Sequence, residues 1–129
     1  MRLEHVALQV ADPVGMADWY VKHLNCSVAR AGGEPSFGRF LLDASGSAMI
    51  EIYRNPRVDV PDYNGTDPLL IHLAFVSDDM PRDRDRLVRA GATVAQDVQK
   101  TADGDEIMML RDPWGVPLQL VTRAEPMLT

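Results

Sequence analysis

The hydrophobic pattern of the first residues predicts a strand followed by a helix. Apolar and polar residues alternate over residues 3–10, and His5 falls on the less apolar of the two faces. Asp12 and Pro13 then supply a helix cap and a proline in the first turn, and apolar residues recur at helical spacing as far as Asn25. The chain therefore begins with a strand and an amphipathic helix that covers a sheet.

Three more strands and a connector complete the first half. The strands are predicted at residues 26–31, 37–42 and 48–54, with turns at Gly32-Gly33 and between Asp43 and Gly46. Residues 55–68 contain three prolines and the turn pair Asn64-Gly65, a composition that resists helix and interior strand alike. We predict a βαβββ module over residues 1–54 and a connector over residues 55–68.

The second half repeats the first. Residues 69–77 form a nearly continuous apolar run that predicts a buried strand, and its one ionisable residue is His72. The segment HVAL at residues 5–8 matches HLAF at residues 72–75. A helix opened by Asp79 and Pro81 follows, closed by Gly91, and then come predicted strands at residues 93–98, 106–110 and 116–121. The second module spans residues 69–123, so the fold class is α+β, with two βαβββ modules in a single domain of residues 1–129.

The repeat makes four polar residues equivalent in pairs. His5 corresponds to His72, and Glu51 on the fourth strand corresponds to Gln119 on the last one. If these strands are neighbours, the four side chains converge on one concave face, where a buried carboxylate and buried imidazoles need compensation. A divalent cation supplies it, and two nitrogen and two oxygen donors suit Zn, Ni, Co, Mn or ferrous iron. The alternative is structural: each histidine could be a hydrogen-bonded core residue, and Gln119 could bond to the backbone.

Composition and charge narrow the functional classes. The chain has 129 residues, 46% of them hydrophobic, and 13 basic against 19 acidic residues give a net charge of −6, without the basic stripe of a nucleic-acid binder. We find no signal peptide and no membrane-spanning run, so we expect a cytoplasmic protein with no membrane partner. Cys26 is the only cysteine and is expected to be a buried small hydrophobe. The run RDRDR at residues 82–86 predicts a solvated helix face, with pairs Asp83–Arg86 and Asp85–Arg89.

The whole chain resembles the vicinal oxygen chelate superfamily, which includes glyoxalase I, bleomycin resistance proteins and extradiol dioxygenases. The motifs that carry the resemblance are HVALQVAD, DWYVKHLNC, IEIYRN, IHLAFVSD and DPWGVPLQLV. It is closest to the metal-dependent glyoxalase I branch. The resemblance implies a cup-shaped, barrel-like mixed sheet and a homodimer in which each metal site takes two ligands from each chain.

The resemblance also implies roles for particular residues. The ligands would be His5, Glu51, His72 and Gln119, and Asn55 stands where glutathione-dependent members keep an asparagine that holds the peptide. Two positions depart from that pattern. Gln119 replaces a glutamate that also moves protons, and a glutamine cannot accept one. Gln9 stands where bacterial glyoxalases tend to have an arginine that contacts glutathione, so glutathione is a possible cosubstrate only.

Two classes of function follow from the sequence. The first is a lyase or isomerase that abstracts a proton next to a carbonyl of a substrate with vicinal oxygens, with Glu51 as the base, a metal stabilising the enediolate, and Tyr53 lining the pocket. Epimerase and dioxygenase chemistry are variants, although both families usually keep a late carboxylate. The second class is a metal-free binding protein of the bleomycin-resistance type. An enzyme-like relic that lost its chemistry with the final carboxylate is a third possibility.

Overall fold

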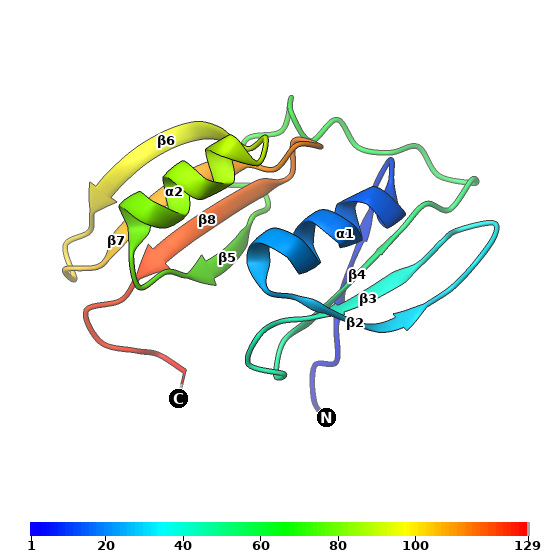
Figure 1. Cartoon of the computed structure of the whole chain (residues 1–129), viewed down its shortest axis with the longest axis horizontal. Helices are drawn as coiled ribbons and strands as arrows, with labels where there is room; N and C mark the ends of the chain where they lie inside the picture. Colours follow the sequence, from blue (N-terminus) through cyan, green and yellow to red (C-terminus); the bar gives the residue numbers. More distant parts are fainter. Residues whose placement is uncertain (129) are drawn as a thin grey trace. The chain divides into compact units, whose positions relative to one another are not determined.

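The computed structural model describes residues 1–128 and divides into two compact units. The first unit ends at Pro61 and the second begins at Asp62, so the division falls inside the proline-rich segment that the sequence marks as a connector. Each unit contains one helix and one four-stranded sheet (Figure 1).

The first unit forms a mixed sheet with one parallel pair of strands. Its elements are β1 (Val6–Gln9), α1 (Pro13–Leu24), β2 (Ser27–Ala31), β3 (Arg39–Leu42) and β4 (Met49–Tyr53). The strand order is β1-β4-β3-β2, with β1 parallel to β4 and the other pairs antiparallel. The first strand and the last strand of the module are therefore neighbours, as the candidate site requires.

The second unit repeats this topology strand for strand. Its elements are β5 (Leu73–Val76), α2 (Met80–Arg89), β6 (Thr93–Lys100), β7 (Glu106–Arg111) and β8 (Pro117–Thr122). The order is β5-β8-β7-β6, again with the first and last strands parallel. The predicted α+β class and the two βαβββ modules are confirmed. Within residues 1–128 each sheet is open at both edges, so the strand ladders do not close into a barrel.

Both helices begin at the predicted aspartates. The carboxylate of Asp12 accepts a hydrogen bond from the Gly15 N–H at 3.0 Å, and that of Asp79 accepts one from the Arg82 N–H at 3.1 Å. A side chain that satisfies an N–H in the first turn fixes the start of a helix. The first helix ends at Asn25, whose φ of 55° is left-handed. Neither helix is long and apolar enough to cross a membrane.

The prediction of one buried strand over residues 69–77 is wrong in its first half. Leu69 and Leu70 are 83% and 78% exposed, and strand β5 begins only at Leu73. The carboxylate of Asp67 accepts a hydrogen bond from the Leu69 N–H, and the Asp67 carbonyl accepts one from the Leu70 N–H. This turn uses the backbone groups that a strand would offer to its neighbour. His72 therefore lies at the entrance of the strand.

One face of the first sheet is core, and the other carries polar side chains. Leu8, Leu41 and Ile52 are buried on the face that α1 covers (Figure 1). Because side chains alternate along a strand, Glu51 and its neighbours on the other strands point to the opposite face. Cys26 is buried as expected, and burial followed by the nearby Asp43 charge raises the pKa of its thiol to about 11. It is therefore a protonated thiol at neutral pH.

Candidate functional site

Strand register places the four predicted ligands equivalently in the two units. Ala7 is the direct partner of Glu51, and Ala74 is the direct partner of Gln119. Each histidine stands two residues before its alanine, so His5 and His72 hold the same position relative to the fourth strand of their unit. The correspondence that the sequence predicts is therefore present in the hydrogen-bonded ladders.

His5 and Glu51 are in contact. The Nε2 atom of His5 lies 3.3 Å from Oε2 of Glu51, and its Nδ1 atom lies 2.9 Å from Oε1 of Glu4. The side chains of His5 and Glu51 are 31% and 23% exposed, so they are half-buried and not fully buried as the sequence argument assumed. Each ring nitrogen faces a carboxylate oxygen. With Nδ1–H donating to Glu4, the Nε2 lone pair and the Glu51 carboxylate need a proton or a cation between them.

His72 is oriented by the backbone. Its Nδ1 atom lies 2.8 Å from the carbonyl oxygen of Pro68, which accepts the Nδ1 proton. This bond fixes the tautomer in which Nε2 carries the lone pair, an arrangement common among metal-bound histidines. Gln119 is half-buried in the middle of β8, between β5 and β7.

Two residues that sequence reasoning missed lie on the Glu51 face of the first sheet. Phe40 on β3 is the direct cross-strand partner of Glu51, and Arg30 on β2 is the direct partner of Phe40. The His5 and Phe40 rings meet edge to face, with centroids 5.3 Å apart and planes at 86°. The Arg30 guanidinium lies over the Phe40 ring, 5.8 Å from its centroid. The alternation of side chains along β3 indicates which face of the sheet Phe40 lies on. Only the pairing register of β3 with β4 shows that Phe40 stands opposite Glu51.

The predicted substrate-binding residues have local structural contacts. Gln9 Nε2 donates to the carbonyls of Asn55 and Val58 at 2.8 and 2.7 Å, and its Oε1 accepts from the Asn55 N–H at 2.9 Å. The Asn55 side chain accepts from the Arg57 N–H at 3.0 Å. These bonds fix the start of the connector beside β1. Contact of Gln9 or Asn55 with a substrate stays a prediction.

Tyr53 lies two residues after Glu51 on β4 and is half-buried. A Cβ atom added to Gly38 would lie 3.8 Å from Glu51 Oε1 and 3.9 Å from Tyr53 Cβ. The loop before β3 therefore runs past both side chains. This position agrees with a pocket-lining role for Tyr53, which stays a prediction.

The donor set fits a metal in part. Among residues 1–128, no three His, Cys, Asp or Glu side chains come together closely enough to hold a metal ion. The adjacent nitrogen and oxygen of His5 and Glu51 suit two positions around a divalent cation, and in the second unit Nε2 of His72 is a nitrogen donor of its own. A complete site thus needs donors from more than one such pair.

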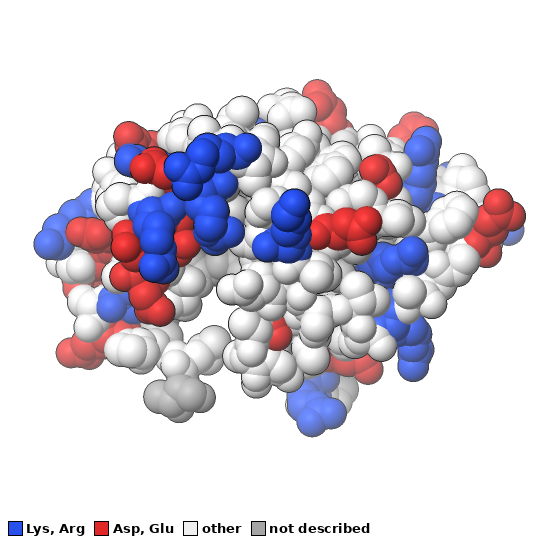
Figure 2. Space-filling model, in the orientation of Figure 1, with Lys and Arg blue, Asp and Glu red and all other residues white. Residues whose placement is uncertain are grey.

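A shallow groove of about 530 Å³ lies elsewhere, between α2 and β6. None of the predicted site residues lines it; its lining residues are Arg84, Asp85, Val88, Arg89, Val94 and Asp97. Figure 2 shows basic and acidic side chains together over α2.

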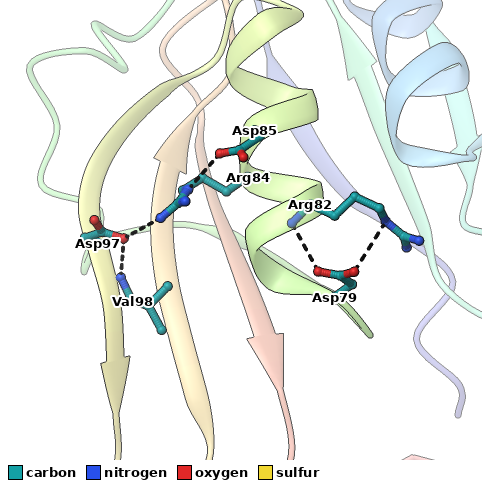
Figure 3. Close-up of polar contacts among 6 residues, drawn as sticks. All are labelled: Asp79, Arg82, Arg84, Asp85, Asp97 and Val98. Carbon is teal, nitrogen blue, oxygen red and sulfur yellow. Dashed lines mark hydrogen bonds and ion pairs between the residues drawn. The ribbon is translucent and has the colours of Figure 1, made fainter.

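The charges of this groove are compensated within it. Arg84 contacts Asp85 at 3.2 Å and Asp97 at 3.4 Å, as Figure 3 shows. The predicted pair Asp83–Arg86 is present at 3.2 Å. The predicted pair Asp85–Arg89 is wrong, because the nearer Arg84 takes the Asp85 carboxylate. The predicted helix face is only partly solvated, because Asp83 is 18% exposed and accepts a hydrogen bond from Ser77 Oγ; that it has no binding role stays a prediction.

Comparisons with known proteins place the chain in a family. No curated protein matches it significantly. The crystal structure of SMU.1112c is similar, with a TM-score of 0.73, 28% identity, and coverage of 94% of this chain and 98% of that one. A glyoxalase I mutant from Zea mays has a TM-score of 0.75 and 22% identity, over 96% of this chain and 46% of that one. TnmS3, an antibiotic binding protein from Streptomyces sp. CB03234, has a TM-score of 0.70 and 17% identity, over 96% and 97% of the two chains. The family model of the Glyoxalase/Bleomycin resistance protein/Dioxygenase superfamily matches residues 2–120, so the chain belongs to that superfamily.

Proposed function

We propose that the protein is a metal-dependent enzyme of the glyoxalase I type, a lyase or isomerase that removes a proton next to a carbonyl of a small substrate with vicinal oxygens. The observation that carries this proposal is the 3.3 Å contact between His5 Nε2 and Glu51 Oε2. The equivalent placement of His72 and Gln119 in the second unit supports it. Superfamily membership supports it further, because members typically use a divalent metal.

The metal would be held by donors from two copies of the chain. His5 and Glu51 of one subunit would supply one pair, and His72 and Gln119 of the partner subunit would supply the other. This mixed nitrogen and oxygen set suits Zn, Ni, Co, Mn or ferrous iron. When bound, the cation would supply Lewis-acid stabilisation of the negative charge that develops on the substrate oxygens. Homodimer formation is then a condition of metal binding.

The remaining chemistry falls to the side chains of this chain. Glu51 is the carboxylate of the predicted set and is half-buried, so it is the group that can accept the substrate proton and return it to the neighbouring carbon. Glu4 holds Nδ1 of His5 and thereby keeps Nε2 directed at Glu51. Gln119 can offer its amide oxygen or its amide protons to a bound group, but it cannot take up a proton.

Metal content, oligomeric state and turnover test the proposal together. Purified protein should hold about one divalent ion per chain and elute as a dimer. It should isomerise thiol hemithioacetals, assayed with and without glutathione. Glu51→Gln should lose turnover, while Glu125→Gln, which removes an exposed carboxylate elsewhere, should not. Absence of bound metal after metal addition, or full activity of Glu51→Gln, would contradict the proposal.

A second candidate function is metal-free binding of a small molecule. The observation that favours it is Gln119, which removes the proton-accepting group from the last strand. The fold similarity to the antibiotic binding protein TnmS3 adds support. Calorimetric titration of metal-free protein with bleomycin distinguishes the two: tight binding without metal favours sequestration, and no binding favours the enzyme.

Other reaction types of the superfamily can be tested in the same way. If hemithioacetals are not converted, acyl-CoA esters and sugar-derived ketones test for an epimerase, and catechols test for a dioxygenase. The cytoplasmic location stays a prediction.

A further inference from the structure

We propose that Arg30 is a specificity residue that binds an anionic group of the substrate, a carboxylate in the first instance. It would do so on the Glu51 face of the first sheet, with the apolar middle of the substrate lying on Phe40. The inference deepens the proposed function and rests on it, because the reacting end of the substrate is placed at His5 and Glu51. It assigns the substrate to the class of carboxylate-bearing compounds.

The position of Arg30 on this face follows from two independent observations. The strand ladders make Glu51, Phe40 and Arg30 direct cross-strand partners in turn, and direct partners point to the same side of a sheet. The contacts agree, since His5 touches both Glu51 and Phe40, and Arg30 lies over Phe40. Glu51, Phe40 and Arg30 therefore form one continuous row, which we call the Glu51 row, and His5 lies against it.

In the described part of the chain, Arg30 has no carboxylate partner, unlike several other arginines, and it lies on the Glu51 face of the first sheet. Arg84, Arg86 and Arg123 each lie within 4 Å of an aspartate. No acidic side chain within residues 1–128 pairs with Arg30, and its guanidinium contacts the Phe40 ring. In a chain with a net charge of −6, an exposed guanidinium left unpaired on the face of the predicted site offers a place for an external anion.

The cation–π contact of Arg30 with Phe40 prepares the guanidinium for that role. A ring under the guanidinium limits the conformations of the long side chain, so less entropy is lost when a ligand binds. The edge of the guanidinium stays free for a bidentate carboxylate. The strands β4 and β2 are two strand spacings apart, roughly 10 Å, which sets the distance between the reacting oxygens and the anionic group.

The second unit offers no equivalent. The same row there runs from Gln119 to Met109 on β7 and Gln96 on β6, with neither an aromatic ring nor a cation. The anion site therefore belongs to the first unit, beside Glu51.

The test compares two hydroxamates on zinc-loaded protein by isothermal titration calorimetry. Both carry the same bidentate hydroxamate, which provides vicinal oxygens; para-(carboxymethyl)benzohydroxamate also has a carboxylate, and para-(carbamoylmethyl)benzohydroxamate has a neutral amide of the same size. Wild-type protein should bind the carboxylate about three- to ten-fold more tightly, the range expected for a charge-assisted contact at an exposed site. In Arg30→Gln the ratio should fall to about one, with the affinity for the neutral compound unchanged.

Matched variants separate this contact from general charge effects. Lys22→Gln removes one positive charge from α1, on the other side of the same sheet, and should leave the ratio as it is in wild type. Arg30→Lys, which keeps the charge but loses the bidentate edge, should retain part of the preference. Equal affinity of wild-type protein for the two compounds, with both binding, overturns the anion site alone. Failure of both to bind overturns the proposed metal site and this inference with it.

Discussion

The two units share a backbone design but differ in the side chains of one row. In both, the first strand pairs in parallel with the last, an aspartate caps the helix, and a histidine stands two residues before the alanine that faces the last strand. The Glu51 row of the first unit carries a carboxylate, an aromatic ring and a guanidinium. The equivalent row of the second unit carries the amide of Gln119, the thioether of Met109 and the amide of Gln96. The two sheets therefore share one topology, whereas the carboxylate of the predicted ligand set lies in the first unit alone.

The largest expected effect comes from exchanging the two polar residues that define this difference. Glu51→Gln should lower turnover by about 10²- to 10⁴-fold, because it removes the one carboxylate of the predicted ligand set. Gln119→Glu should retain or raise turnover, since it adds a second proton acceptor. Steady-state assays of metal-loaded protein measure both, and the double variant Glu51→Gln with Gln119→Glu shows whether the base can work from the other unit. A single Glu51→Gln variant with wild-type turnover would remove this residue from the mechanism.

Much of the fold could be predicted from the sequence because its signals are local. The helix starts at Asp12 and Asp79 follow from cap chemistry, and the repeat follows from two short matching strands. The extent of the strand near His72 could not be predicted, because its apolar run also contains Leu69 and Leu70, which a turn at Asp67 holds in solvent.

The predicted site was harder to complete from the sequence. The relation between His5 and Glu51 follows from the repeat, since both positions recur. Phe40 and Arg30 have no such recurrence, and the bulge between Val28 and Arg30 shifts the register that brings them together. A bulge changes which residues face each other without leaving a clear pattern in the sequence.

The turns before the last strands provide the next comparison. Asp112 is 3% exposed and accepts hydrogen bonds from the N–H groups of Trp114 and Val116. Asp43 holds the equivalent place in the first unit but is half-buried. We expect Asp112→Ala to lower the free energy of unfolding by about 3 kcal/mol and Asp43→Ala by about 1 kcal/mol, because an unmade hydrogen bond costs more in the interior. Urea denaturation measures both.

Asparagine variants serve as the controls for these turns. An asparagine keeps one acceptor oxygen, so Asp112→Asn should recover more than half of the loss. Equal costs for the two alanine variants would show that burial does not distinguish the turns.

The partners of the two histidines predict a smaller difference, in metal affinity. His5 is held by a side chain, Glu4, whereas His72 is held by the backbone carbonyl of Pro68. Glu4→Ala should weaken metal binding about ten-fold, at the low end for a residue that orients a ligand. Pro68→Ala keeps its carbonyl and should change the affinity little. Competition with a chromogenic zinc chelator measures both, and equal affinities for wild type and Glu4→Ala would refute this role of Glu4.

The smallest expected effect is the pH dependence of the first turn. Burial alone would raise the pKa of Asp43, but hydrogen bonds from Ala48, Ser45 and Ser47 outweigh it and lower the pKa below 3.8. A carboxylate with a lowered pKa stabilises the folded state above its unfolded pKa, and this contribution is lost as the pH falls through the folded value. Asp43→Asn should therefore flatten the decline in stability below about pH 4, by roughly half a kcal/mol, in unfolding curves compared with wild type. An unchanged slope in that range would mean that Asp43 titrates alike in the folded and unfolded chains, and that its hydrogen bonds shape the turn without contributing to acid sensitivity.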